Sequence, residues 1–383
     1  MARRLYVYAF LEDFILLYPV YSVLFAEAGL SAAQISSLFV VWSVTGFVVE
    51  LPAGLWADVF SRRSLLVAAP LLAGAGFGLW AFVPSYPAFA AGFVLWGAGS
   101  SLRSGALQAL VYEALERSGD AGSYARLIGR SEAVALLGVV AASAVASPVL
   151  AVGGYRSLGA VSVAACAGCA VAGWFLPEER AVRVAGGVSL AGVLREGAAQ
   201  VRRDPAVRGA LVLAAVVTGV TSVDEYVPLL VRATGVAAVW VPLLVLVVMA
   251  GDAAGGWMAG RGGRWLGPVV GAGAVLLAAG SAGGSVWGVP LVAAAFGAFR
   301  WSVAAVDARL QERVGDGARA TVTSLAGFGT DVVSVAVFGG YAVGSAWAGP
   351  GVLMAVAAVP FGVVAVVVGV SGRRRRGGVL RGE

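Results

Sequence analysis

Residues 54–63 read GLWADVFSRR, one Asp and two Arg set between two long apolar runs. The rest of the chain is equally apolar: 60% of its 383 residues are hydrophobic and 13% are charged, with a mean hydropathy of +0.88. Soluble domains carry about 25% charged residues. Apolar stretches of roughly 20 residues, the length that crosses a hydrocarbon core, recur from end to end. The sequence therefore predicts an all-α protein that crosses a membrane many times.

Apolar runs between charged residues and Gly or Pro breaks predict twelve membrane spans. Their ranges are 5–26, 34–57, 64–83, 88–112, 126–148, 157–176, 208–231, 237–260, 267–284, 290–312, 319–343 and 350–371. The first run also has the look of a signal peptide, with small residues on both sides of Glu27. Glu12 and Asp13 interrupt that run, which favours a retained helix.

The distribution of Arg is an independent test of this span count. All 27 basic residues are Arg, and 23 of them fall in the termini and the even-numbered connections. Only Arg156 and Arg232 fall in the odd-numbered connections, while Arg103 and Arg300 lie within spans. Because positive residues gather on the cytoplasmic side, we expect a multi-pass protein of the cell membrane with both termini cytoplasmic. Residues 54–63 are then a cytoplasmic turn between spans two and three.

A long inner connection divides the chain into two sets of six spans. The expected parts are an N-terminal six-helix bundle at 1–176, a linker with an amphipathic surface helix at 177–207, a C-terminal six-helix bundle at 208–372 and a basic tail at 373–383. The tail is read as the last cytoplasmic anchor, with a patch for anionic lipid headgroups as the alternative.

The two halves repeat one design. An offset of 202 residues superposes Glu50 on Asp252, Gly54 on Gly256, Ala57 on Ala259 and Arg62 on Arg264. Each half also places one Arg within its fourth span and an acidic pair ahead of a Pro within its first. These residues are Arg103 with Glu12, Asp13 and Pro19, and Arg300 with Asp224, Glu225 and Pro228. A repeat of this kind predicts two pseudo-symmetric bundles.

At this point the chain resembles the major facilitator superfamily. Its signature G-x-x-x-D-x-x-x-R-R is matched by Gly54, Asp58, Arg62 and Arg63, and the longer pattern adds Glu50, Pro52 and Ala57. A second pattern is matched by Ser104, Gly105, Ala109, Tyr112, Glu113 and Leu115. The resemblance implies two rocking bundles with a conformational latch at Glu50, Gly54, Asp58, Arg62 and Arg63, and a weaker copy at Asp252. Ser61 stands where the signature commonly has Gly.

The antiporter pattern of the fifth span fits poorly. Gly129 and Gly138 have its spacing, but Ala142 and Ser143 stand where a Gly-Pro pair is expected. This departure leaves an assignment to efflux without support from that motif.

Charged residues within the spans are the candidate substrate and proton-coupling groups. They are Glu12, Asp13, Arg103, Asp224, Arg300 and Asp331, and Asp252 lies at a similar depth. A charge at mid-membrane costs about 2.5 to 3.5 kcal/mol on insertion scales, so these groups must be paired or hydrated. In one interpretation each acid only neutralises an Arg or caps a broken helix near a Pro. Because acids outnumber Arg, the alternative is that surplus carboxylates exchange protons.

The sequence thus predicts a secondary active transporter that moves a small amphiphilic organic molecule by alternating access, with export in exchange for protons as the leading hypothesis. Aromatic residues that suit such a substrate are Tyr18, Tyr21, Trp42, Trp96 and Trp301. An uptake symporter or facilitator is the first alternative, and a membrane-embedded sensor or enzyme is the second. A permease subunit of an ATP-driven complex fits the paired halves less well.

Missing residue types exclude several kinds of site. The chain has neither Lys nor His, so it has no G-x-x-x-x-G-K-[ST] phosphate loop, no Lys Schiff base and no H-E-x-x-H zinc site. Cys166 and Cys169 form a C-x-x-C within an apolar run, where packing is favoured over a redox or metal role. We expect no enzyme activity, no cofactor, no metal and no nucleic-acid partner. The expected partners are the substrate, protons and the lipid bilayer, with the chain as a monomer.

Overall fold

The computed structural model describes residues 1–177, 201–260, 265–315 and 319–379, and side chains within these ranges except at 51–59, 121, 319–320 and 371–379. Every regular element in the described ranges is helical, which confirms the all-α prediction. Eight of the described helices are long and apolar enough to cross a membrane. The predicted surface helix within 177–207 lies almost wholly outside the described residues.

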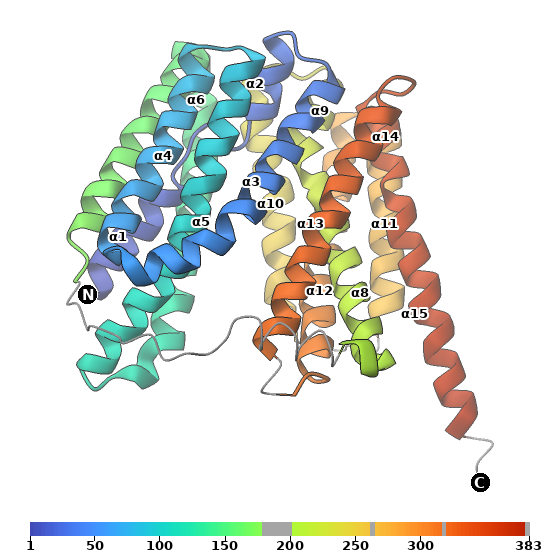
Figure 1. Cartoon of the computed structure of the whole chain (residues 1–383). Helices are drawn as coiled ribbons and strands as arrows, with labels where there is room; N and C mark the ends of the chain where they lie inside the picture. The colour runs from blue at the N-terminus through green and yellow to red at the C-terminus, as the bar shows by residue number, and fades with distance from the viewer. Residues whose placement is uncertain (178–200, 261–264, 316–318, 380–383) are drawn as a thin grey trace. The chain divides into compact units, whose positions relative to one another are not determined.

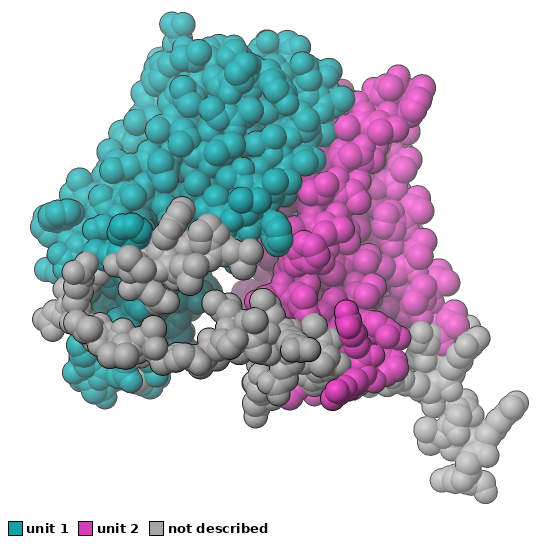
Figure 2. All heavy atoms as spheres, viewed as in Figure 1, with its two compact units in different colours: residues 1–183, 237–246 teal, residues 184–236, 247–383 magenta. Residues whose placement is uncertain are grey.

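The chain forms two compact units (Figure 2). Unit 1 comprises residues 1–183 and 237–246, and unit 2 comprises residues 184–236 and 247–383. The helices of unit 1 are α1 (Ala2–Asp13), α2 (Tyr21–Glu27), α3 (Ala32–Val59), α4 (Arg62–Phe82), α5 (Tyr86–Arg117) and α6 (Tyr124–Trp174). Those of unit 2 are α8 (Pro205–Val220), α9 (Val227–Ala233), α11 (Leu266–Ala282), α12 (Val289–Gln311), α13 (Arg319–Gly344), α14 (Pro350–Val356) and α15 (Ala358–Val379). Helix α10 (Val241–Trp257) is divided between the units. Figure 1 labels these helices along the chain.

The first predicted span, 5–26, is not one continuous helix. Helix α1 ends at Asp13, and α2 begins at Tyr21 after a stretch of turns. Pro19 lies in this stretch, where its ring removes a backbone N–H and disfavours helix in the residue before it. The turns are closed by the N–H groups of Val20 and Tyr21, which donate to the Leu17 carbonyl at 3.0 and 2.9 Å. The acidic pair, Glu12 and Asp13, therefore lies where the helix breaks.

The α-helix of the seventh predicted span is also interrupted, here by a 3-10 segment instead of turns. A 3-10 segment, Thr221–Tyr226, separates α8 from α9 and contains both Asp224 and Glu225. Pro228 follows in the first turn of α9, so the Asp224 carbonyl receives its hydrogen bond from the Val227 N–H instead. Both units thus carry an acidic pair at a break in their first span. Discontinuous helices of this kind line the substrate and ion sites of transporters.

Helix α6 contains two predicted spans, 126–148 and 157–176, in one hydrogen-bonded run of 51 residues. A straight helix of that length would be about 75 Å long, more than twice the thickness of a bilayer core. The direction changes at Gly154, whose φ of 62° and ψ of −166° are outside the helical region. Only glycine adopts this conformation without strain. The two predicted spans are therefore distinct segments that meet at Gly154.

Small residues let the helices of each unit pack at short range. In unit 1, α4 lies against α5 and α6, and α1 lies against α6. A Cβ added to Gly99 of α5 would be 2.6 Å from the Ala69 carbonyl oxygen of α4. In unit 2, a Cβ added to Gly297 of α12 would be 2.6 Å from the Gly251 carbonyl oxygen of α10. These glycines bring backbones together, as small residues do between membrane helices.

Ser61, which stands where the G-x-x-x-D-x-x-x-R-R signature commonly has Gly, starts a helix. Its side chain caps α4, and the hydroxyl oxygen accepts the Ser64 N–H at 3.2 Å. Serine is a preferred N-cap because it satisfies one of the backbone donors left free at a helix start. The turn between α3 and α4 is therefore only two residues long, Phe60 and Ser61. Arg62 and Arg63 open α4 directly after it.

Candidate functional site

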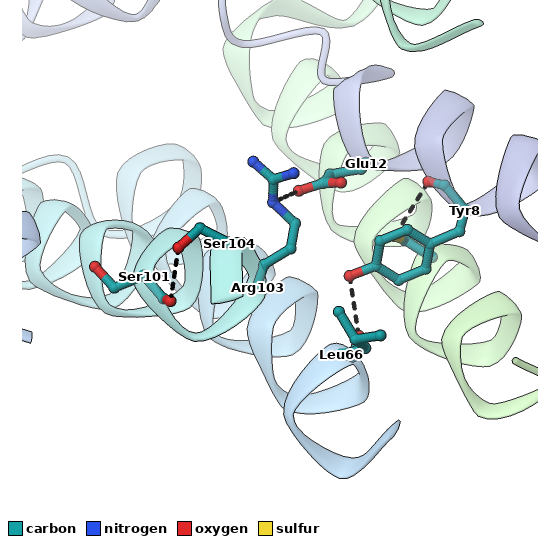
Figure 3. A network of polar contacts seen from close by, with 7 residues as sticks. Tyr8, Glu12, Leu66, Ser101, Arg103 and Ser104 are labelled. Carbon is teal, nitrogen blue, oxygen red and sulfur yellow. Dashed lines mark hydrogen bonds and ion pairs between the residues drawn. The ribbon is translucent and has the colours of Figure 1, made fainter. Parts of the chain in front are cut away.

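A polar cluster lies where α1 ends in unit 1 (Figure 3). The Arg103 guanidinium of α5 forms an ion pair with the Glu12 carboxylate of α1. Asp13 also interacts electrostatically with Arg103. The structure therefore brings together the three charged groups that the sequence predicts for this half, two carboxylates with one guanidinium. All three side chains are partly buried.

Hydrogen bonds to neighbouring helices hold the end of α1 in place. Ser162 of α6 accepts the Leu17 N–H at 3.3 Å and so satisfies a backbone donor that the helix break leaves free. The Tyr8 hydroxyl donates to the Leu66 carbonyl of α4 at 3.1 Å. Gly138 of α6 lies against the Phe10 carbonyl of α1, so the glycine of the poorly fitting antiporter pattern serves a close helix contact. The position of Glu12 thus rests on both α4 and α6.

An open pocket adjoins this cluster. Its cavity volume is about 30 Å³, and it is lined by Glu12, Tyr18, Phe77, Trp96 and Cys166 together with small residues of α4 and α5. A cavity of this volume has room for one or two water molecules, since one water needs about 10–15 Å³. Glu12 is the one charged residue among its described lining residues. The pocket therefore places one carboxylate beside aromatic rings in a space the size of water molecules.

Three of the five aromatic residues predicted for a substrate site form a stack in unit 1. The rings of Tyr18 and Trp96 are stacked at 5.3 Å, and so are those of Trp96 and Trp42. Tyr21 is 5% exposed and packs within the core, where its ring contacts Phe25 and Trp80. Trp301 of unit 2 is also buried. Of the five, Tyr18 and Trp96 thus line the pocket, together with Phe77.

Unit 2 holds a second charged cluster with a different composition. Arg300 of α12 donates from Nε to Oδ2 of Asp252 on α10 at 2.7 Å. Asp224, in the 3-10 segment, interacts electrostatically with both residues and is exposed. The structure therefore brings together three of the four residues predicted here. The fourth, Asp331, is half-buried on α13 and has an interaction of its own.

The turn at residues 54–63 is tied by an ion pair to the second sequence pattern, which contains Ser104 and Glu113. Arg62, at the start of α4, forms a 2.5 Å ion pair with Oε2 of Glu113 on α5. Both side chains are mostly buried, at 15% and 21% exposed. Sequence reasoning singled out both motifs but did not pair them. The signal available in the sequence was an acid in one motif, Glu113, and an Arg pair in the other, Arg62 and Arg63.

The rest of the predicted latch is only partly within the described residues. Gly54 and Asp58 belong to α3, but their side chains lie outside the described set, and Arg264 lies outside it altogether. Glu50 is exposed, and Arg63 has an interaction of its own. The role of Asp58 as a latch therefore stays a prediction.

Residues 5–339 match the sequence profile of the Major Facilitator Superfamily. The chain belongs to this superfamily. It is accordingly a multi-pass membrane transporter and not an enzyme. No curated protein matches the chain in sequence.

Solved structures of superfamily transporters share its fold. The nucleoside transporter NupG superposes with a TM-score of 0.73 at 12% identity, over 97% of this chain and 98% of that one. The POT family transporter PepTSo gives 0.68 at 14% identity, over 98% and 99%. The E. coli fucose:proton symporter FucP gives 0.58 at 16% identity, over 96% and 97%. At these identities the likeness shows the fold alone.

The two cysteines have different surroundings within this superfamily fold. Cys169 is fully buried and its thiol donates to the Tyr8 carbonyl at 3.5 Å, whereas Cys166 lines the pocket beside Glu12. Both are free thiols. Both residues are buried, as the packing interpretation of the C-x-x-C predicts, with Cys166 at 3% exposed. The sequence did not predict that Cys166 also lines the pocket. Among the described residues, no group of three or more Cys, Asp or Glu side chains is placed to hold a metal ion.

Proposed function

We propose that this transporter moves a small organic molecule by alternating access and couples that movement to protons. The observation that carries the proposal is the cluster at the end of α1, where Glu12 forms an ion pair with Arg103 beside a small pocket and Asp13 interacts electrostatically with the same guanidinium. A carboxylate in excess of its counter-ions can take up and release a proton at a site that binds substrate. Intramembrane ionisable groups of transporters mark such pathways.

Alternating access has its support in the repeated design of the two units. Each has a break in its first span next to an acidic pair, and each has an Arg–carboxylate pair within the predicted spans. We propose twelve spans in two bundles, residues 1–176 and 208–372, with a 177–207 linker, a 373–383 tail and both termini in the cytoplasm. The bundles rock about a site near the membrane midplane.

The proposed latch lies at the cytoplasmic ends of α3 and α4. The Arg62–Glu113 ion pair fixes the start of α4 to α5 within unit 1. We propose that Asp58, with Glu50, Gly54 and Arg63 around it, contacts the other bundle when the inner side is closed. Asp252 is the counterpart of Glu50 in the repeat, and Gly260 replaces Asp58 there, so the second copy latches weakly.

We propose that the protein is a monomer in the cell membrane. We also propose that it exports its substrate in exchange for protons. Uptake in symport is the second candidate, because FucP, which shares the fold, is a fucose:proton symporter. The first step of the test is a metabolite comparison between cells with and without the protein, which identifies a transported compound. Its flux is then measured in right-side-out and inverted vesicles with an imposed pH gradient.

An exporter coupled to protons accumulates the compound in inverted vesicles when their lumen is acid. Glu12→Gln and Asp13→Asn should each reduce this gradient-driven accumulation at least tenfold, while exchange of labelled for unlabelled compound without a gradient persists. Glu27→Gln is the matched control, because Glu27 is exposed at the end of α2 and accepts a hydrogen bond from Tyr155. Full gradient-driven flux in both cluster variants would refute proton coupling at this site.

A further inference from the structure

We propose that exposed tryptophans at the ends of the membrane helices bind the two headgroup layers of the lipid bilayer and so fix the depth at which the protein lies. Such anchoring is independent of the substrate and of proton coupling. It is indicated by where the exposed indole rings lie, by the length of the helices between them and by the residue types that are exposed in mid-helix.

The tryptophans divide by their position along the helices. Within helices, Trp80 and Trp301 are buried, while Trp42 and Trp96 stack on each other in unit 1. Trp56 lies outside the described side chains. The described tryptophans that are more than half exposed lie at helix ends or in connections, and they are Trp174, Trp240, Trp257, Trp265, Trp287 and Trp347. Exposed indole rings are therefore confined to the ends of helices among the described side chains.

Two consecutive helices carry an exposed tryptophan at both ends. Trp240 directly precedes α10 and Trp257 ends it. Trp265 is the N-cap of α11, and Trp287 lies in the 3-10 turn Val286–Gly288 that follows α11. Each helix has 17 residues. At 1.5 Å per residue that is about 25 Å, close to the roughly 30 Å of a hydrocarbon core. The rings beyond the helix ends are thus spaced to reach both headgroup layers.

The direction of the chain sorts these rings into two sets. Because α10 and α11 cross the membrane in succession, Trp257 and Trp265 share one face, and Trp240 and Trp287 share the other. From Trp287 the chain crosses with α12 and returns with α13, after which Trp347 follows. Trp347 therefore joins Trp240 and Trp287. In the topology proposed above, this set lies on the outer face.

Trp174 belongs to the cytoplasmic set. It ends α6, and Arg4 of α1 donates from Nη1 to the carbonyl of the next residue, Phe175, at 2.8 Å. Positive residues of membrane proteins gather on the cytoplasmic side. The hydrogen bond to Arg4 thus places Trp174 on the same face as Trp257 and Trp265. Each face of the membrane then has exposed indole rings from several helices.

The residues exposed in mid-helix are of another type. On α15, Val359, Val363 and Val366 are each more than half exposed. Their side chains have no polar atom and suit contact with lipid tails. An indole ring combines a large apolar surface with an N–H donor, and tryptophan is enriched where the membrane meets water. The change from valine in mid-helix to tryptophan at helix ends is the change expected between the hydrocarbon core and the headgroups.

Paramagnetic lipids test the depth of each ring in the full chain. The protein is labelled with 5-fluorotryptophan in lipid nanodiscs, and each fluorine NMR resonance is assigned by its loss in the corresponding Trp→Phe variant. One sample contains a lipid with a nitroxide on its headgroup, a second has the nitroxide near the end of an acyl chain, and a third contains a soluble gadolinium chelate.

We expect the headgroup nitroxide to remove most of the intensity of the exposed tryptophans and the acyl-chain nitroxide to remove little. Trp80 and Trp301 are the controls, because both are buried and should keep their intensity with the gadolinium chelate. A stronger effect of the acyl-chain nitroxide on the exposed tryptophans would overturn the proposal. So would loss of their signals to gadolinium with no effect of either nitroxide.

Paired variants test whether the rings hold the protein in the bilayer. Trp257→Leu/Trp287→Leu should lower the melting temperature by a few degrees in nanodiscs and leave it unchanged in detergent micelles, which have no fixed thickness. Trp257→Tyr/Trp287→Tyr is the matched control, because tyrosine is also enriched at membrane interfaces. Equal losses in the Leu and Tyr pairs, or the same loss in micelles, would contradict an anchoring role. Neither experiment measures flux, so its failure leaves the transport proposal standing.

Discussion

The two units pair the Arg of their fourth predicted span in different ways. Arg103 pairs with Glu12 at the broken end of α1, whereas Arg300 pairs with Asp252 on α10. In the repeat, Asp252 corresponds to Glu50, which is exposed and lies on a different helix from Glu12. The two halves therefore share an Arg within the fourth predicted span but not the carboxylate that pairs with it. A sequence repeat predicts the position of a charged residue within a span better than it predicts the residue that neutralises it.

The difference in partner goes with a difference in surroundings. In unit 1 the side chains of Arg103 and Glu12 are 36% and 21% exposed, and the pair adjoins a pocket with aromatic walls. In unit 2 those of Arg300 and Asp252 are 55% and 31% exposed. Asp224 is left exposed beside them. The more enclosed pair is accordingly the one at the proposed substrate site.

The largest expected effect is a difference in the free energy of unfolding between variants of Arg103 and Arg300. Arg103→Ala should lower the free energy of unfolding by about 3–5 kcal/mol, because it leaves Glu12 and Asp13 without their guanidinium in a partly buried site. Arg300→Ala should cost about 1 kcal/mol, because both partners of that pair are better hydrated. The free energies come from reversible denaturation of each purified variant in mixed micelles.

Restoring neutrality checks the cause of that loss. The double variant Arg103→Ala/Glu12→Gln should recover more than half of the stability that Arg103→Ala loses, because it removes one of the stranded carboxylates. Equal losses for Arg103→Ala and Arg300→Ala would remove the proposed difference between the units.

The close helix contacts should behave alike in the two units. Gly99→Ala and Gly297→Ala should each cost about 1–3 kcal/mol, because each added methyl would meet a backbone carbonyl that cannot move independently. Gly105→Ala, on the same helix as Gly99, has nothing within 4 Å of the new methyl and should be neutral or stabilising. The same denaturation experiment measures all three. A Gly105→Ala loss as large as that of Gly99→Ala would argue against crowding as the cause.

The smallest expected effect concerns the helix caps. Asp204 accepts the N–H groups of Ala206 and Val207 at 2.7 and 3.4 Å at the start of α8, whereas Ser61 accepts one N–H at the start of α4. Asp204→Ala should therefore cost about 1–2 kcal/mol and Ser61→Ala about 0.5–1 kcal/mol. Hydrogen exchange of the first turn of each helix, read by mass spectrometry, localises the effect. Faster exchange confined to other segments would show that neither residue acts as a cap.

Much of the fold could be predicted from the sequence because membrane spans have a strong signal. Apolar runs of roughly span length, the Arg bias and the motif at residues 54–63 all indicated the superfamily, which the profile match confirmed. Pro19 and Pro228 indicated breaks, and both first spans are broken near them. The extent of the break in the first span was not predicted, because apolar composition does not register the turns between Asp13 and Tyr21.

The pairing of charges was less predictable. Composition showed that acids outnumber Arg within the spans, but it did not choose Glu12 as the partner of Arg103 or Asp252 as that of Arg300. Such choices depend on how helices far apart in the chain rotate against one another, which hydropathy does not encode. The Arg62–Glu113 ion pair was missed for the same reason. Trp301 was expected near the substrate and is buried instead, since an apolar run does not say which face of a helix meets a cavity.

Burial of both native cysteines leaves this transporter open to site-directed labelling without removing them first. Cys166 is 3% exposed although it lines the pocket, and Cys169 is fully buried beneath Tyr8. A water-soluble maleimide added from either face of the membrane should therefore leave the native chain unmodified. A single cysteine introduced at an exposed loop position would then report on its own which face that loop occupies.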